Sequence, residues 1–571
     1  MSTDTDNAAP PTEVEGIKAR SRHLRGTLQQ SLDDRLTGAI AADDTQLSKF
    51  HGLYQQDDRD VRSERQRQLL EPLYSFMIRA RIPGGELTSE QWRALDAIAD
   101  THANGSIRLT TRQAVQFHGV FKRDLKASMQ AIDRSLLDTL AACGDVNRNV
   151  MATANPARSG LHAEVYRLAG ELSRHLTPAT GAYREIWLNG EKVTEDAAEI
   201  EPIYGDTYLP RKFKLGVALP PDNDIDVYSQ DLAFVAVVSG RAISGYQVLV
   251  GGGMGMSHGE PATYPRLATP IGVCAADEVI AVAEAVVTTQ RDFGDRTNRK
   301  HARLKYTIDD RGIDWFRGEV EARAGVTLGE PGPPIFAGNG DRYGWVEDEN
   351  GRWHYTLFIE NGRVADRPGT ALKSCLAEIA AAEVAGFRLT PNQNLILTSV
   401  DAADRGRVDA LFERHGVDTP ERVSPLRRLS LACVGLPTCG LAMAESERYL
   451  PELVTRIDAL LDRHGLGSQP ITIRMTGCPN GCARPYIAEI GLVGKGPGRY
   501  QLYLGASSQG DRLNVLYGEN LDEAGILATL EPLFVDYAAD RRSGESFGDF
   551  LIRHGVVAPT GEPGDFHARA N

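Results

Sequence analysis

Apolar and polar positions alternate in the same order twice along the chain. In the first half, the pattern predicts a strand ending in a glycine turn at 76–87 (FMIRARIPGGEL), a helix at 90–100 (EQWRALDAIAD) and a further strand pattern at 107–120 (IRLTTRQAVQFHGV). In the second half, it predicts the same elements at 355–365 (YTLFIENGRVA), 371–381 (ALKSCLAEIAA) and 387–400 (FRLTPNQNLILTSV). The two halves therefore resemble copies of one unit.

The similarity continues beyond these elements. NVMATANPARSGLHAEVYRLAGELSRHL follows the first copy and LSLACVGLPTCGLAMAESERYLPELVTRI follows the second, which aligns Pro156 with Pro437. Further on, SGYQVLVGG near residue 246 corresponds to GRYQLYLGA near residue 500. A duplication of this length predicts two similar lobes related by an approximate twofold axis, with a cleft between them.

Three segments lie outside the repeated pattern. Residues 1–16 are small, polar, acidic and proline-containing, which predicts a disordered tail. Residues 17–72 have a heavily charged helical pattern, which suits an arm that docks a partner and equally suits a solvated helical face. Residues 329–345 are rich in glycine and proline, which predicts a linker between the halves.

The composition is that of a large ordered chain. Its 571 residues are 42% hydrophobic and 25% charged, which supplies apolar material for several cores and excludes a mainly disordered protein. The formal net charge of -14 argues against a general nucleic-acid binder. No apolar run of about 18 residues occurs, and the N-terminus lacks the pattern of a signal peptide. We therefore expect a cytoplasmic protein without a membrane anchor.

Four of the seven cysteines gather in the second copy of the duplication. Cys433 and Cys439 have five residues between them, Cys478 and Cys482 have three, and glycine and proline surround both pairs. Such turns let the backbone wrap a metal cluster and donate N–H groups to its sulfurs, which favours an iron–sulfur cluster. A structural zinc site and inert thiols remain alternatives, whereas a disulfide is disfavoured in a cytosolic chain.

The first copy lacks these cysteines. Ala152 stands where Cys433 stands in the second copy, and Lys212 and Lys214 lie near the position of the second cysteine pair. One lobe therefore supplies metal ligands and its counterpart supplies cations. The other three cysteines have no partner at a ligand spacing and are predicted to be packing residues: Cys143, Cys274 and Cys375.

Basic residues gather on the predicted strands and turns of the first copy. Strand alternation places Arg108 and Arg112 on one face, and it does the same for Lys212 and Lys214. A single strand arginine is usually solvent-exposed or paired, but several cations on one face repel each other unless an anion lies between them. The grouping favours an anionic ligand or a cofactor with several carboxylates. Its members are Arg81, Arg108, Arg112, Arg148, Arg211, Lys212 and Lys214.

Two further features are expected to play no direct part in chemistry. GGGMG at 251–255 follows a strand but precedes MSHGEPATYP, which cannot begin a helix, so no dinucleotide site is expected there. His118 lies on a predicted strand and is expected to be a packed, hydrogen-bonded side chain.

Several long motifs together resemble one family. ACVGLPTCGLAMAESER, TGCPNGCARPYIAEIGLVGKGPGRYQLYLG, IRLTTRQAVQFHG, DVNRNV, LPRKFK and FHGLYQQDDRDVRSER are similar to segments of the sirohaem-containing sulfite and nitrite reductases, and most similar to the haemoprotein (beta) subunits of assimilatory NADPH-sulfite reductase. The resemblance implies an α+β, internally duplicated nitrite/sulfite reductase fold of pseudo-twofold symmetry. It would have ferredoxin-like half-domains at 73–146 and 346–424, and two sirohaem/iron–sulfur lobes at 147–328 and 425–571.

The resemblance also implies functional residues. The ligands of a 4Fe-4S cluster would be Cys433, Cys439, Cys478 and Cys482, and Cys482 would also bridge to the sirohaem iron. The sulfite-binding cations would be Arg81, Arg148, Lys212 and Lys214, of which the two lysines are the preferred proton donors. The sirohaem carboxylates would be bound by Arg108, Arg112, Gln116, Asn149, Arg303 and Lys305.

The activity implied by the resemblance is the six-electron reduction of sulfite to hydrogen sulfide in sulfate assimilation and cysteine biosynthesis. No flavin or nicotinamide site is recognisable in the chain, so a separate flavoprotein subunit carrying FAD and FMN would deliver electrons from NADPH. The arm at 17–72 is the candidate docking element. The alternatives left open are a ferredoxin-dependent sulfite or nitrite reductase and, from another class, a zinc-stabilised binding scaffold.

Overall fold

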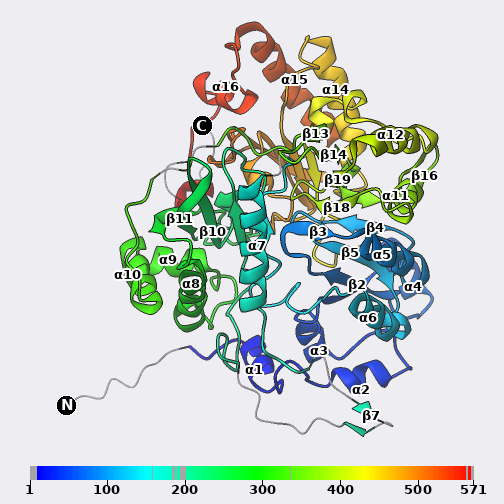
Figure 1. Ribbon diagram of the computed structural model, residues 1–571, viewed down its shortest axis with the longest axis vertical. Coiled ribbons are helices and arrows are strands. Elements are labelled where there is room, and N and C mark those ends of the chain that lie inside the picture. The colour runs from blue at the N-terminus through cyan, green and yellow to red at the C-terminus, as the bar shows by residue number, and fades with distance from the viewer. Residues whose placement is uncertain are drawn as a thin grey trace.

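The structure, a computed structural model, describes residues 9–156, 159–182, 187–188, 191–192, 201–332, 334, 336–560 and 563–567. Three large hydrophobic clusters form its core: one in each lobe and one shared by the two half-domains. In Figure 1 the first half-domain is blue, the first lobe mainly green, the second half-domain yellow-green and the second lobe yellow to red. In the part of the chain that the structure describes, no helix is long and apolar enough to cross a membrane.

The two half-domain sheets have the same strand order and exchange their edge strands. The first sheet has the order β1-β2-β5-β4-β15 and the second the order β13-β14-β19-β18-β3, with all neighbours antiparallel. Strand β15 comes from the second half of the chain but pairs with β4, and β3 comes from the first half but pairs with β18. This reciprocal exchange explains why the half-domains share one core. The strands are β1 (Leu53–Asp57), β2 (Tyr74–Ala80), β3 (Glu86–Leu87), β4 (Ile107–Leu109), β5 (Val115–Val120), β13 (Gly344–Glu347), β14 (Trp353–Leu357), β15 (Arg363–Val364), β18 (Gly386–Leu389) and β19 (Leu395–Val400).

Helices of the half-domains pack against each other across the same interface. Helix α5 begins at a capping box formed by Thr88 and Gln91. Its buried Trp92 stacks on Phe387 of the second half-domain, with ring centroids 4.6 Å apart. The helices are α5 (Ser89–His102), α6 (Leu125–Arg134), α11 (Leu372–Ala381) and α12 (Arg405–Arg414).

The lobe sheets also repeat one topology. Their orders are β6-β9-β10-β11-β12 and β20-β21-β22-β23-β24, and in each the first three strands are parallel and the last two are added antiparallel. The duplicated α+β fold is therefore confirmed. The strands are β6 (Met151–Ala152), β9 (Leu215–Ala218), β10 (Leu232–Ser239), β11 (Ala242–Val250), β12 (Thr269–Cys274), β20 (Ser430–Ala432), β21 (Ile473–Thr476), β22 (Ile490–Gly496), β23 (Arg499–Leu504) and β24 (Val515–Leu521).

Helices cover the lobe sheets. Helix α7 contacts β6 and β9 of the first lobe and also the glycine turn at Pro83–Gly85, so it joins the first lobe to the first half-domain (Figure 1). The helices of the first lobe are α7 (Gly160–His175), α8 (Val279–Phe293), α9 (Leu304–Arg311) and α10 (Ile313–Ala324). Those that precede or belong to the second lobe are α13 (Pro425–Arg428), α14 (Leu450–Arg463), α15 (Glu523–Asp540) and α16 (Phe547–Arg553).

Strand pairing corrects the expected alignment of the two copies by one residue. Cys433 follows β20 and donates its N–H to the carbonyl of Met475, and Thr153 follows β6 and donates its N–H to the carbonyl of Val217. Met475 and Val217 occupy the same place in the two sheets. Thr153, and not Ala152, therefore corresponds to Cys433, because the second copy has one more residue before the aligned proline.

The arm is built into the body of the protein. Its strand β1 is the edge strand of the first half-domain sheet, which therefore begins before residue 73. Leu47 and Phe50 are buried in the core of the first lobe. The helices of the arm are α1 (Glu13–Ala19), α2 (Leu28–Asp33), α3 (Ala42–Leu47) and α4 (Arg62–Arg67).

Part of the expected disordered tail is helical. Helix α1 begins at Glu13, and the buried Glu15 forms ion pairs with Lys18 and Arg296. The carboxylate of Glu15 therefore secures the start of the chain to the first lobe. Residues 1–8 lie outside the described residues.

Candidate functional site

A row of polar side chains crosses the sheet of the first half-domain. The strand pairings place Arg79 opposite Gln116, Gln116 opposite Arg108 and Arg108 opposite Arg363. Phe76, Ile78 and Ala80 of β2 point into the half-domain core and are fully buried. Because side chains alternate along a strand, Arg79 lies on the opposite face of the sheet. This face is directed toward the second lobe, because Arg108 Nη2 donates to the carbonyl of Ala432 at 2.8 Å.

Arg79 of this row and four further cations form a group that we call the cationic cluster. Among the described residues, the three arginines of the cluster bond to carbonyl and amide oxygens, a hydroxyl and a sulfur, and to no carboxylate. Among the described residues, neither lysine ammonium has a side-chain hydrogen bond or an ion pair. Positive charge therefore accumulates without a carboxylate in contact. The members are Arg79, Arg112, Arg148, Lys212 and Lys214.

The lysines show how strongly this environment disfavours unbalanced positive charge. Burial, with Arg211 nearby, lowers the pKa of Lys212 to about 7. Burial and then the neighbouring Lys212 hold the pKa of Lys214 well below its usual range. Burial also lowers the pKa of Arg112 to about 9. A bound anion would offset both the cost of burying these cations and the repulsion between them.

Arg81, expected to bind sulfite, lies outside the cationic cluster. Strand β2 ends one residue before it, and its guanidinium turns to Asp138 in an ion pair of 2.9 Å and to the hydroxyl of Ser173 at 2.8 Å. The buried Nε of Arg81 has no partner among the described residues, so the role of Arg81 in sulfite binding stays a prediction. Arg79, two residues earlier and inside β2, lies in the cluster, and alternation along the strand does not by itself separate it from Arg81.

Three residues expected to bind sirohaem carboxylates are engaged by the protein itself. Arg108 is buried and pairs with Glu447. Asn149 is 1% exposed and bonds backbone groups on two neighbouring loops, so it joins those loops. With its amide oxygen turned toward Arg79, the orientation that satisfies both side chains, Gln116 accepts hydrogen bonds from that guanidinium. Each contributes to the site by holding another part of it.

Arg303 and Lys305 are committed inside the first lobe. Arg303 forms a bidentate ion pair with the buried Asp231, with a shortest distance of 2.7 Å. Lys305 Nζ donates to the carbonyls of Gly253 and Gly255 at 3.2 and 2.9 Å. Lys305 therefore holds the GGGMG loop in place. No helix follows this loop in residues 251–268.

The four cysteines come together in the second lobe. Burial raises the pKa of Cys433 to about 12 and of Cys478 to about 11. The nearby Cys482 and Cys439 also act to raise both pKa values, so the four thiols lie close to one another. The backbone N–H of Gly477 donates to Cys433 Sγ at 3.2 Å. Cys482 is exposed whereas Cys478 is buried. Cys482 is therefore the thiol best placed to reach a group outside the cysteine cluster.

Cys482 faces the cations across the interface between the lobes. Burial lowers the pKa values of Lys212 and Arg108, and the negative charge of a Cys482 thiolate opposes both shifts. These two cations belong to the first lobe and the first half-domain. The thiols and the cations therefore meet at one place.

The donor set fits an iron–sulfur cluster better than a zinc ion. Tetrahedral zinc with Zn–S bonds of about 2.3 Å needs thiolates about 3.8 Å apart. No three described His, Cys, Asp or Glu side chains are placed to hold a metal ion. A 4Fe-4S cluster holds its thiolates further apart, and backbone N–H groups that donate to sulfur suit such a cluster.

The cationic cluster has a buried donor that suits a cofactor bearing carboxylates. The Nε of Arg112 has no partner among the described residues.

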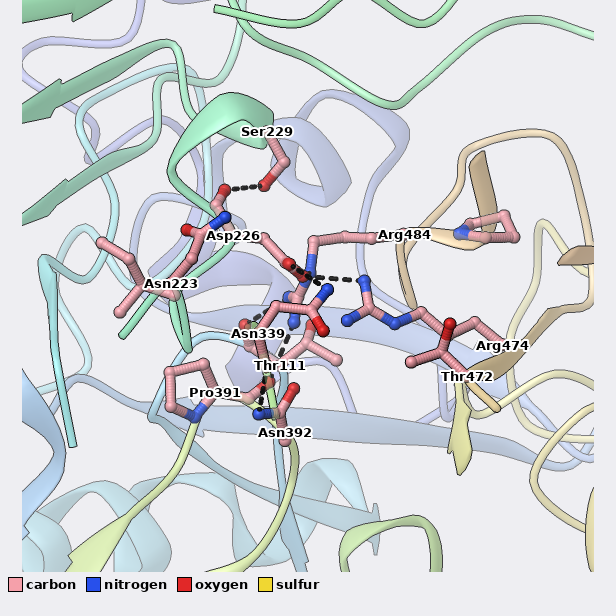
Figure 2. A network of polar contacts seen from close by, with 12 residues as sticks. Thr111, Asn223, Asp226, Ser229, Asn339, Pro391, Asn392, Thr472, Arg474 and Arg484 are labelled. Carbon is pink, nitrogen blue, oxygen red and sulfur yellow. Dashed lines mark hydrogen bonds and ion pairs between the residues drawn. The ribbon is translucent and has the colours of Figure 1, made fainter. Parts of the chain in front are cut away.

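A buried charge network, absent from the sequence-based expectations, ties the cysteine loop to the first lobe (Figure 2). Asp226 forms ion pairs with Arg474, at 2.7 Å, and with Arg484, two residues after Cys482. Arg484 Nη1 donates to the carbonyl of Thr111 at 2.9 Å, and Thr111 Oγ1 donates to the carbonyl of Cys482 at 3.1 Å. The ion pairs join residues 248 and 258 positions apart, so no local pattern could have revealed them.

Comparisons with known proteins point the same way. A family model described as the nitrite/sulfite reductase ferredoxin-like half domain matches residues 69–135 and 346–415, and one described as the nitrite and sulphite reductase 4Fe-4S domain matches residues 169–328. The latter segment lies in the first lobe, whereas the four cysteines lie in its duplicate. The solved structure of the Mycobacterium tuberculosis NirA protein is 25% identical, with a TM-score of 0.77 over 95% of this chain and 96% of that chain.

Curated relatives match nearly the whole chain. They include proteins named as the hemoprotein beta-component of NADPH sulfite reductase from Staphylococcus saprophyticus and from Myxococcus xanthus, each 56% identical over 97% of this chain and 98% of the relative. The protein of the same name from Xanthomonas campestris is 57% identical over 95% of this chain and 96% of the relative. With this identity over almost the full length, the chain belongs to the family of NADPH sulfite reductase haemoprotein beta-components, within the nitrite and sulfite reductases.

Proposed function

We propose that this chain is the haemoprotein subunit of an assimilatory NADPH-sulfite reductase and reduces sulfite to hydrogen sulfide in the cytoplasm. The observation that carries the proposal is that the loop of Cys482 lies beside the cations: Thr111 Oγ1 donates to the carbonyl of Cys482, and Lys212 and Arg108 lie near its thiol. Cys433, Cys439, Cys478 and Cys482 would hold a 4Fe-4S cluster, with Cys482 as the bridge to sirohaem. These cofactors, when bound, supply six electrons to the substrate, one at a time.

The chain's own residues would bind the anion and supply protons. A guanidinium group carries positive charge and a fork of N–H donors, so those of Arg79, Arg112 and Arg148 can bind sulfite oxygens and cofactor carboxylates. Each oxygen that leaves as water takes two protons. Lys212 and Lys214, whose pKa values are lowered by burial, can give up a proton more readily than an ordinary lysine and are the proposed donors.

The affinity for sulfite is expected to depend on the protonation of Lys212. Because burial lowers its pKa to about 7, the ammonium is present below pH 7 and is lost as the pH rises. The KM for sulfite should therefore increase above pH 7, by at most about tenfold per pH unit for one proton. A Lys212→Arg variant keeps its charge over this range and should show a flatter profile.

The KM for sulfite, measured between pH 6 and pH 9 in both proteins, checks this prediction. Sulfite and any other titrating group affect both proteins alike, so the difference between the two profiles isolates Lys212. Superimposable profiles would contradict a role for its protonation.

The arm offers a surface for a flavoprotein partner. We define the leucine patch as Leu36, Leu69 and Leu70, whose side chains are 98%, 94% and 48% exposed. Glu71 joins the two segments, because it accepts hydrogen bonds from Thr37–Gly38 at 2.6 and 2.9 Å. Grouped exposed apolar side chains are typical of protein interaction sites. We therefore propose that the flavoprotein subunit binds here and delivers electrons from NADPH.

Changing both Leu36 and Leu69 to glutamate is expected to weaken flavoprotein binding by at least about tenfold. Burying one leucine side chain contributes about 1.5–3 kcal/mol, and 1.4 kcal/mol corresponds to a tenfold change in Kd. NADPH-driven sulfite reduction should fall with binding, while activity with a chemical reductant should stay within about twofold. Isothermal titration calorimetry with the flavoprotein measures the change.

Leu136→Glu is the matched control, since Leu136 is 90% exposed but lies outside the arm. Deleting the whole arm would be uninformative because β1 belongs to the half-domain sheet. Unchanged flavoprotein binding by the double variant would refute the leucine patch as the docking site. Turnover supported by ferredoxin but not by the flavoprotein would instead favour the ferredoxin-dependent group.

A further inference from the structure

The turn at residues 142–144 presents three successive acceptors to two arginines of the cationic cluster. Arg79 Nη1 donates to the carbonyl of Ala142 at 3.4 Å and to Cys143 Sγ at 2.8 Å. Arg148 donates through Nε and Nη2 to the carbonyl of Gly144 at 3.3 and 3.2 Å. One short turn therefore holds both guanidinium groups.

None of the three acceptors is a carboxylate, which distinguishes this arrangement from an ordinary ion pair. The neighbouring Arg81 pairs with the carboxylate of Asp138, so its charge is cancelled locally. In the part of the chain that the structure describes, the Arg79 guanidinium donates to a sulfur, a carbonyl and the amide oxygen of Gln116, and to no carboxylate. Neutral acceptors fix the direction of a guanidinium while leaving its full charge for a bound anion.

The arm supports this turn from behind. The N–H of Ala141 donates to the carbonyl of Phe50 at 2.8 Å, and the N–H of Arg79 donates to the carbonyl of Gly52 at 3.0 Å. Gly144 has a φ of +89°, and a Cβ at this position would lie 2.9 Å from the ring of Phe50. The turn therefore has little room to shift without moving both arginines.

Cys143 differs from the other two cysteines outside the iron–sulfur ligand set. Cys274 and Cys375 lie in hydrophobic clusters, as expected for packing residues. Cys143 is also fully buried, but its Sγ accepts a hydrogen bond from Arg79, and the carbonyl of the adjacent Gly144 accepts one from Arg148. The expectation that Cys143 only packs is therefore wrong.

We propose that Cys143 is a positioning residue for the anion site: its sulfur, carried on the 142–144 turn, holds Arg79 toward the bound substrate. This inference rests on the proposed function, because it assigns sulfite as the anion. Cys143 itself does not touch the substrate and undergoes no covalent change. It acts by restricting Arg79 to one orientation.

Two substitutions separate positioning from packing. Cys143→Ala removes the acceptor and is expected to raise the KM for sulfite about tenfold, with kcat changed by less than about threefold. Cys143→Ser removes the same sulfur but supplies a hydroxyl acceptor, so its KM should return to within about threefold of the unmodified protein. The Kd of sulfite for the oxidised, cofactor-loaded protein, measured without turnover, should follow the same order.

Cys375→Ala is the matched control, since that thiol is buried in the half-domain core away from the cluster. An unchanged KM and Kd in Cys143→Ala, or an equal loss in the serine and alanine variants, would overturn the proposal. So would a loss of bound iron in proportion to the loss of activity. If the unmodified protein bound sulfite but did not reduce it, the proposed function would fail, while the ratio of Kd values between variants would still decide the role of Cys143.

Discussion

Replacing Asp226 by alanine is expected to cost about 3–5 kcal/mol of folding free energy, because it leaves buried guanidinium charge without its partner. Asp226 is fully buried between Arg474 and Arg484. Burial alone would raise its pKa, but the two arginines outweigh burial and hold the pKa below its usual value. The carboxylate is therefore ionised and compensates the arginines at neutral pH. The denaturant midpoint of the cofactor-loaded protein measures the effect.

The same substitution is expected to reduce retention of the iron–sulfur cluster. Arg484 follows Cys482 by two residues and is held by Asp226 and by the carbonyl of Thr111 (Figure 2). Without Asp226 the loop that carries Cys478 and Cys482 loses this buried ion pair with the first lobe. Iron content after gel filtration should fall with the midpoint.

Asp222→Ala is the control from the same loop. Asp222 pairs with Arg342, whose side chain is 44% exposed, so this pair should contribute at most about 1 kcal/mol. An Asp226→Ala protein no less stable than Asp222→Ala would show that the network does not hold the lobes together.

Lys214→Met is expected to lower kcat for sulfite reduction about 100-fold, the lower end of what a positioned proton donor contributes. Its ammonium has no hydrogen bond or ion pair among the described residues, and burial beside Lys212 lowers its pKa. Methionine keeps a similar length and apolar stem but cannot deliver a proton. Sulfide production with a chemical reductant measures turnover, and iron content and the visible spectrum measure cofactor loading.

Lys300→Met serves as the control for this change. Lys300 is 54% exposed and pairs with Glu260 at the surface, so turnover should remain within about twofold. If Lys214→Met lowers cofactor content and turnover by the same factor, Lys214 has a structural role and is not the proton donor.

The duplication and the cysteine cluster could be predicted because both leave local signals. The two strand patterns repeat in order, and ligand cysteines occur in pairs at short spacings within glycine-rich turns. The structure confirms the duplication, whereas the role of the four cysteines as cluster ligands stays a prediction.

The cations were harder to assign because their roles depend on partners distant in sequence. Strand alternation alone makes Arg79 and Arg81 equally plausible members of the cationic cluster. They differ in that β2 ends before Arg81 and in that Arg81 pairs with Asp138. Arg303 is neutralised by Asp231, which lies 72 positions earlier in the chain. The arm was expected to be separable, but its strand pairs with β2 through contacts that charge patterning does not encode.

The central claim is that thiols and cations meet to form one sulfite-reducing site. The most direct test is the yield of sulfide when the purified, cofactor-loaded chain receives a counted number of electrons from a chemical reductant in the presence of sulfite. We predict one sulfide for every six electrons consumed. Consumption of electrons without sulfide, or no consumption at all by a loaded protein, would contradict the account.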